Sequence, residues 1–155
     1  MPRHKSRMTR VLVMDDDTQV RDGTAMLLTA KGFDVVAVAD GESGVAAVQT
    51  AAAPFDLVIV DLFMPGMDGL ATTRAIRALD ASVPIIAVSG FMLGDWRLEM
   101  PNFDAMAAEA GAHFTLYKPF KPAVLFQAMH EALTGAPPTG NAPPKPLLAL
   151  RSQSG

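Results

Sequence analysis

The feature that most constrains the fold of this chain is a regular alternation of short apolar segments with longer segments of helical periodicity. Short apolar runs at 10–14, 34–38, 56–60, 83–88 and 113–117 are predicted to be buried strands. Segments at 18–31, 42–53, 68–79, 104–110 and 122–133 are predicted to be helices. Strands that alternate with helices along a chain form parallel sheets through right-handed crossover connections.

This pattern predicts an α/β fold with a doubly wound, five-stranded parallel sheet of the flavodoxin-like type. The alternation occupies residues 9–134, which we expect to form one domain. Residues 1–8 are basic with few apolar side chains, and we expect a flexible arm there. Residues 135–155 are rich in proline, and we expect a disordered tail that is too short for a separate DNA-binding domain.

Composition narrows the function classes. The chain has no cysteine, which excludes disulfides, thiol chemistry and cysteine-ligated zinc. Its net charge of −3 argues against general nucleic-acid binding. No segment approaches the roughly 20 apolar residues needed to cross a bilayer, and the basic first residues lead into no signal-peptide pattern. We therefore expect a cytoplasmic protein with no direct nucleic-acid or membrane contact.

Polar residues follow four of the five predicted strands. They are Asp15, Asp16 and Asp17 after the first strand, Asp61 after the third, Ser89 after the fourth and Lys118 after the fifth. The carboxyl ends of parallel strands meet at one edge of the sheet, where doubly wound folds bind their ligands. We therefore expect these side chains to gather at a single site.

A cluster of three carboxylates is electrostatically unfavourable unless a cation or a proton compensates it. Mg²⁺ prefers carboxylate and carbonyl oxygens together with several waters, so the residues predict a magnesium site at Asp15, Asp16 and Asp61. Such a site suits phosphoryl transfer, in which an oxygen nucleophile attacks in line while positive charge surrounds the equatorial oxygens. Asp61 is then the natural nucleophile, because carboxylates can form acyl phosphates. Lys118 and Ser89 would contact phosphoryl oxygens.

Four sequence blocks resemble the receiver domain of two-component response regulators. They are Val11-Leu12-Val13-Met14-Asp15-Asp16-Asp17, Asp61-Leu62-Phe63-Met64-Pro65-Gly66-Met67-Asp68-Gly69, Val88-Ser89-Gly90 and Lys118-Pro119-Phe120. The resemblance covers roughly residues 10–133 and keeps the family's order of motifs at compatible spacing.

The resemblance implies a role for each matching position. Asp15 and Asp16 would bind Mg²⁺ with Asp61, which would be the phosphorylation site, and the backbone carbonyl of Phe63 would complete the protein ligands. Ser89 would be the hydroxyl switch residue and Lys118 the site's lysine, followed by a cis peptide bond to Pro119. A sensor histidine kinase or a histidine phosphotransfer protein would donate the phosphoryl group. The chain would act as a stand-alone regulator that signals through protein contacts rather than as an enzyme.

Three departures from the family pattern affect these expectations. Thr115 occupies the position of the usual aromatic switch residue, which puts the common switching mechanism in doubt. Residues 90–103 form a longer segment than usual, rich in aromatic and methionine side chains, which could fold onto the core or bind a partner. Phe63 and Phe91 lie where many members place polar groups that orient the hydrolytic water. We therefore predict a slowly hydrolysing phosphoryl group, with structural packing as the alternative.

The remaining aspartates and glycines near the predicted site have structural explanations. Asp17 or Thr18 is expected to cap the first helix, and Asp68 the third. Gly66 and Gly69 are expected to supply permissive backbone angles in a tight loop.

Three other functions remain open at this point. The first resembles a haloacid-dehalogenase phosphatase, in which Asp15 would be the nucleophile and Asp17 the general acid. Asp95 and Glu99 would supply that family's last acidic motif. The family's lysine precedes this motif, however, whereas Lys118 follows it. A nucleotide-binding domain would need glycines where the three aspartates stand. A pseudo-receiver would bind proteins without being phosphorylated.

Overall fold

The computed structural model describes residues 7–64, 67–89, 103–118 and 120–136. The strands are β1 (Arg10–Met14), β2 (Asp34–Val38), β3 (Leu57–Asp61), β4 (Ile85–Ser89) and β5 (Phe114–Tyr117). The helices are α1 (Thr18–Ala30), α2 (Gly41–Thr50), α3 (Gly69–Leu79), α5 (Phe103–Ala110) and α6 (Pro122–Thr134). All strand pairs are parallel, and the sheet order is β2-β1-β3-β4-β5. The predicted doubly wound fold is confirmed.

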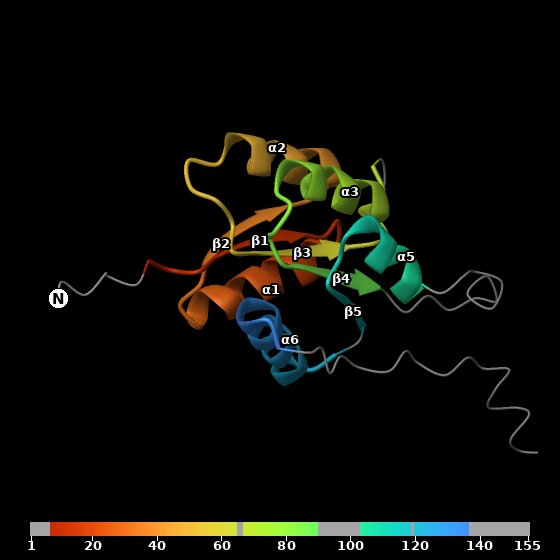
Figure 1. Ribbon diagram of the computed structural model, residues 1–155. Coiled ribbons are helices and arrows are strands. Elements are labelled where there is room, and N and C mark those ends of the chain that lie inside the picture. Colours follow the sequence, from red (N-terminus) through yellow and green to blue (C-terminus); the bar gives the residue numbers. More distant parts are fainter. Residues whose placement is uncertain (1–6, 65–66, 90–102, 119, 137–155) are drawn as a thin grey trace, which may run out of the picture.

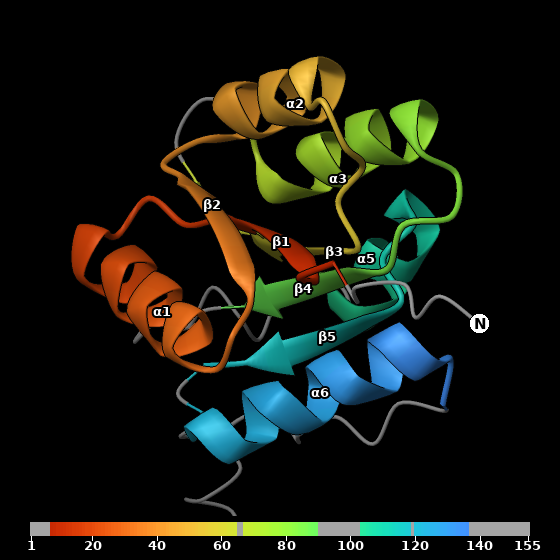
Figure 2. The same cartoon turned by 90° about the vertical axis from the view of Figure 1, so that its left-hand side faces the viewer.

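The sheet lies between two layers of helices, with α2, α3 and α5 on one face and α1 and α6 on the other (Figures 1 and 2). Alternate side chains along each strand enter two separate apolar clusters. In β1, for example, Leu12 and Met14 belong to the cluster under α2 and α3, whereas Val11 and Val13 belong to the one under α6. Burial on both faces explains why β1, β3 and β4 are apolar runs.

Several predicted boundaries shift by one to three residues. The helix predicted at 42–53 begins at Gly41, because Asp40 caps it through a hydrogen bond from the Ser43 N–H, and it ends at Thr50. The strand predicted at 83–88 begins at Ile85, after a proline that cannot donate to the sheet, and extends to Ser89. Such shifts are expected, since hydrophobic patterns locate elements better than they locate their ends.

Both predicted caps that the structure describes are present. The Asp17 carboxylate accepts hydrogen bonds from the Gln19 and Val20 N–H groups at the start of α1. The Asp68 carboxylate accepts one from the Ala71 N–H at the start of α3. Caps of this kind each stabilise a helix by about 1 kcal/mol. Neither aspartate is therefore needed to explain the chemistry of the acidic cluster.

The explanation expected for Gly69 is wrong. Its φ is not positive, so permissive backbone angles are not the reason for glycine at this position. A Cβ atom there would lie 2.3 Å from the Asp61 carbonyl oxygen, which shows that α3 begins in direct contact with the end of β3. Gly66 lies outside the described residues. Glycine thus sets how closely α3 approaches Asp61.

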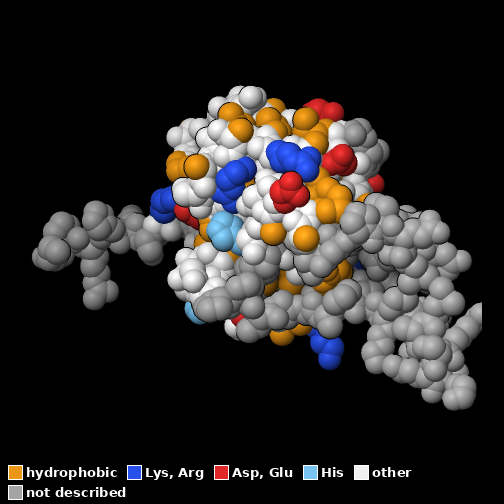
Figure 3. Space-filling view, turned by 45° about the vertical axis from the view of Figure 1, so that its right-hand side comes forward, with side chains coloured by type: hydrophobic (Ala, Val, Ile, Leu, Met, Phe, Trp, Pro, Cys, Tyr) orange, Lys and Arg blue, Asp and Glu red, His pale blue; other side chains and the backbone are white. Residues whose placement is uncertain are grey.

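The surface and the ends of the domain carry few further signals. On the face shown in Figure 3, hydrophobic side chains are interspersed with positively and negatively charged ones. Of the predicted N-terminal arm only Arg7 and Met8 are described, and Arg7 forms an ion pair of 2.7 Å with Asp56. The predicted C-terminal tail lies outside the described residues beyond Ala136. Within the described ranges, no helix has the length and apolar character needed to cross a membrane.

Candidate metal centre

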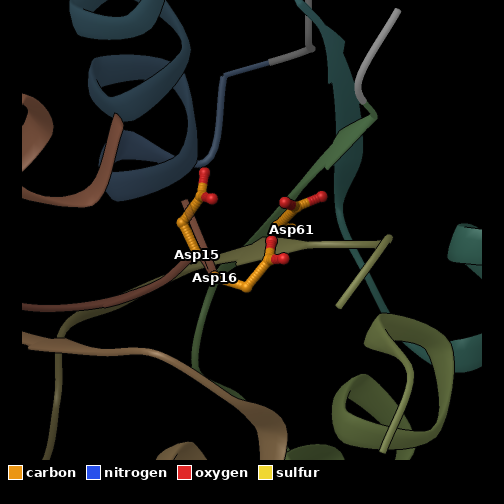
Figure 4. A group of neighbouring side chains, drawn as sticks. All are labelled: Asp15, Asp16 and Asp61. Atoms are coloured by element: carbon orange, nitrogen blue, oxygen red, sulfur yellow. The ribbon is translucent and has the colours of Figure 1, made fainter. Parts of the chain in front are cut away.

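Three carboxylates meet where β1 and β3 end. Met14 pairs with Val60 in the parallel register, so Asp15 and Asp61 are the next residues along two neighbouring strands. One carboxylate oxygen from each of Asp15, Asp16 and Asp61 lies within 4.8 Å of the others. Figure 4 shows the three groups gathered at this edge of the sheet. The structure therefore brings together the three acids that the sequence predicts to form a cluster.

Lys118 extends from the end of β5 into this cluster. Its Nζ lies 2.7 Å from Asp15 Oδ2 and 3.8 Å from Asp61 Oδ2. The lysine therefore forms its close ion pair with Asp15 and only a longer one with Asp61. One ammonium group cannot balance three carboxylates, so the site retains excess negative charge.

The ionised form of Asp61 is disfavoured in this arrangement. Its side chain is nearly inaccessible, and burial raises its pKa to about 6. That value is the balance of several effects: the Phe63 N–H, which donates to Asp61 Oδ1 at 3.0 Å, and the Lys118 ammonium lower the pKa, while the charges of Asp15 and Asp16 add to the effect of burial. An additional cation at the cluster would relieve this cost, because it favours the ionised carboxylate.

The chemistry of the donor set fits Mg²⁺. Carboxylate oxygens from Asp15, Asp16 and Asp61 are hard ligands, and Asp16 is exposed, so solvent can reach that side of the cluster. Mg²⁺ binds through few carboxylates and keeps several waters, which such a half-open cluster allows. The acidic cluster is therefore consistent with the magnesium site of a receiver. The role expected for the Phe63 carbonyl stays a prediction.

Two contacts of Asp15 are not evident from the sequence. Asp15 Oδ1 accepts a hydrogen bond from the Asp17 N–H at 2.9 Å, and a guanidinium nitrogen of Arg21 donates to the Asp15 carbonyl oxygen at 3.0 Å. Arg21 thus ties the first turn of α1 to the backbone of a cluster residue. The only signal in the sequence is a basic residue shortly after an acidic run, which on its own is not specific.

Ser89 and Thr115 carry buried hydroxyl groups. Ser89 is fully buried at the end of β4, and Thr115 is buried in β5. In the part of the chain that the structure describes, neither hydroxyl has a hydrogen-bond partner. Buried polar groups without partners are rare and often mark functional positions. The other expected features, Phe91, Pro119 and most of the segment 90–103, lie outside the described residues.

The placement of Asp17 weighs against the phosphatase alternative. Its carboxylate caps α1 and is not one of the three acids that gather in the described cluster. The residues expected to supply that family's later acidic motif, Asp95 and Glu99, lie outside the described ranges.

Comparisons with known proteins agree with this geometry. The family model of the response regulator receiver domain matches residues 11–130. The DNA-binding response regulator MtrA of Mycobacterium leprae is 34% identical over 114 residues, which are 73% of this chain and 46% of that protein. The two-component response regulator ORR41 of Oryza sativa subsp. japonica is 47% identical over 85 residues, or 54% of this chain and 67% of that one. The chain thus spans about half the length of MtrA.

Solved structures of single receivers are also similar. A CheY-like receiver domain protein from Methanospirillum hungatei JF-1 gives a TM-score of 0.71 at 26% identity, covering 83% of this chain and 96% of that one. The chemotaxis response regulator CheY4 of Vibrio cholerae gives a TM-score of 0.69 at 28% identity, covering 81% and 99% of the two chains. With the family model matched over most of the chain and the acidic cluster at the expected strand ends, this chain belongs to the response regulator receiver domain family.

Proposed function

We propose that this chain accepts a phosphoryl group on Asp61 in a Mg²⁺-dependent reaction and passes the signal on through protein–protein contacts. Receiver domains act in phosphorelay signalling with histidine kinases, typically as phospho-accepting modules rather than as enzymes. The donor would be a phosphohistidine on a sensor histidine kinase or a histidine phosphotransfer protein. The observation that carries the proposal is a buried Asp61 carboxylate held among Asp15, Asp16 and Lys118.

Each residue of the site would have its own part in the transfer. A carboxylate oxygen of Asp61 attacks the phosphorus atom, the P–N bond to the donor histidine breaks, and the imidazole nitrogen leaves with the electron pair. The Phe63 N–H holds one carboxylate oxygen and so orients the nucleophile. Asp15, Asp16, Asp61 and the Phe63 carbonyl would hold Mg²⁺. When bound, the ion supplies positive charge to the transferring phosphoryl group.

Two further side chains would contact the phosphorylated product. Lys118 lies close enough to both acids that its ammonium group can leave Asp15 for a phosphoryl oxygen. Ser89, with a buried hydroxyl that lacks a partner among the described residues, would donate to another phosphoryl oxygen. Ser89 would thereby gain a partner for its buried hydroxyl, and Lys118 would exchange its contact with Asp15 for one with the phosphoryl group, so phosphorylation would reorganise this edge of the sheet.

The aromatic side chain of Phe63 bears on the lifetime of the product. It is half-buried against the apolar cluster under α2 and α3 and carries no group that could orient a water for attack on phosphorus. We therefore propose a slow rate of self-dephosphorylation. This property would suit a regulator whose phosphorylated form must persist long enough to bind a partner.

Mg²⁺-dependent labelling with acetyl phosphate tests the proposal. Wild type should gain one phosphoryl group by intact-protein mass spectrometry, and chelation of divalent cations should abolish the gain. Asp61→Asn should remain unlabelled, whereas Asp22→Asn, an exposed change on α1 away from the cluster, should label like wild type. Absence of label in wild type would favour the pseudo-receiver, and repeated turnover of a small phosphate ester would favour the phosphatase.

A further inference from the structure

We propose that the aromatic ring of Tyr117 responds when Ser89 moves toward the phosphoryl group. Thr115, at the position where the family usually has an aromatic residue, would not take this role. The inference rests on the proposed function, because it concerns the conformational response to phosphorylation of Asp61. It assigns a positioning role to a residue that the family pattern does not mark, since the usual aromatic position is occupied by Thr115.

The register of the last two strands places Tyr117 next to Ser89. In the β4–β5 pair Ser89 is the direct partner of Tyr117, while Thr115 is the partner of Ala87. Paired residues on neighbouring parallel strands point to the same face and lie about 4.8 Å apart. Thr115 lies two residues before Tyr117 on β5, so its diagonal distance from Ser89 is about 8 Å. The side chain directly beside the buried hydroxyl is therefore the tyrosine.

The shared face can be identified from the two apolar clusters. Val88 and Leu116, the pair between these positions, belong to the cluster under α6. Ala87 belongs to the opposite cluster under α2 and α3. Side chains alternate along a strand, so Ser89 and Tyr117 both point to the α3 and α5 side, away from α1 and α6. Ser89 is fully buried and Tyr117 is 7% exposed, so the two side chains share a confined space.

A backbone hydrogen bond connects the same two strand ends to the acidic site. The Lys118 N–H donates to the Ser89 carbonyl oxygen at 2.8 Å, directly after Tyr117. The side chain of Lys118 reaches the opposite way, to Asp15 and Asp61. A change at the phosphoryl site that draws in either Ser89 or Lys118 therefore acts on the peptide that carries Tyr117.

These contacts suggest how the ring would respond. The Ser89 hydroxyl gains a partner by turning toward a phosphoryl oxygen, and it then vacates part of the space beside Tyr117. Tyr117 is the aromatic side chain paired with Ser89, and close-packed interiors do not leave such space unfilled. Thr115 cannot respond in the same way, because its short β-branched side chain is held beside Ala87 and has a restricted χ1.

The composition of the chain makes this inference directly testable, because Tyr117 is its one tyrosine. Protein made with 3-fluorotyrosine gives a single ¹⁹F signal from position 117. Mg²⁺ with beryllium fluoride, which mimics a phosphoryl group on a carboxylate, should shift this signal in wild type. The same addition should leave it in place in Ser89→Ala, while Thr115→Val should retain the shift.

The outcomes separate this inference from the proposed function. Labelling of wild type by acetyl phosphate is measured on the same fluorinated sample. If Asp61 is labelled but the ¹⁹F signal does not move, or moves equally in Ser89→Ala, the role of Tyr117 is refuted and the acceptor role of Asp61 stands. If Thr115→Val alone abolishes the shift, the response runs through Thr115 instead. If no label and no mimic binds, the proposed function itself fails.

Discussion

Replacing Asp61 by asparagine should stabilise the metal-free protein, although it removes the proposed acceptor. Asparagine keeps an oxygen that can accept the Phe63 N–H but carries no charge to be buried. The folded protein raises the Asp61 pKa from 3.8 to about 6. Each pKa unit is worth about 1.4 kcal/mol. The ionised carboxylate therefore costs the folded state roughly 3 kcal/mol at about pH 8.

The pH dependence follows from the sign of that shift. Because the folded pKa is raised, the stability associated with a protonated Asp61 is fully present below pH 3.8 and is lost as the pH rises through about 6. The free energy of unfolding of Asp61→Asn should therefore exceed that of wild type by an amount that grows between these two pH values and stays constant above them. Saturating Mg²⁺ should reduce the difference, because it binds the native wild-type site.

Urea denaturation in EDTA at several pH values measures this difference. Asp22→Asn, the same chemical change at an exposed position of α1, serves as the matched control and should stay within about 0.5 kcal/mol of wild type. If Asp61→Asn is no more stable than wild type at about pH 8, or if its advantage does not shrink in acid, then burial of the Asp61 charge is not the dominant cost at the site.

Three further predictions concern other parts of the domain. Gly69→Ala should destabilise the protein by about 1–3 kcal/mol, because the added Cβ would collide with the Asp61 carbonyl oxygen. The same change should weaken Mg²⁺ binding measured by calorimetry. As a control, Gly23→Ala in α1 should be neutral or stabilising, because nothing lies within 4 Å of the added Cβ. His113 accepts a hydrogen bond from the Ile85 N–H on Nδ1, and its pKa is lowered by burial and by Arg77. Wild type should therefore lose more stability than His113→Gln as the pH falls below about 6.5; parallel pH profiles from chemical denaturation would contradict this. Phe63→Asn should shorten the lifetime of the phosphoryl group, measured by decay of the labelled mass, and an unchanged lifetime would favour a packing role for the ring.

The fold could be predicted because its determinants are local and repeated. Apolar runs with polar residues at their carboxyl ends fix both the strand positions and the edge at which a ligand binds. The same logic predicts that Asp15, Asp16 and Asp61 lie together, and the structure agrees. The caps at Asp17 and Asp68 were also predictable, because capping depends on residues only a few positions apart.

Features that depend on contacts between distant segments could not be predicted. The close approach of α3 to β3 explains Gly69, yet a sequence shows only that a glycine is present. The pairing of Ser89 with Tyr117 depends on the register of β4 and β5, which a shift of one residue would change. Arg21 lacks a recognisable motif, and its role depends on how α1 packs beside Asp15.

The most direct test of the account is to locate the phosphoryl group itself. Borohydride reduction converts an aspartyl phosphate into homoserine, which peptide mass spectrometry assigns to one position. After treatment of wild type with acetyl phosphate, we expect homoserine at position 61 when Mg²⁺ is present and none when the ion is chelated. Homoserine at position 15 or 16, or at 61 regardless of the metal, would contradict the account.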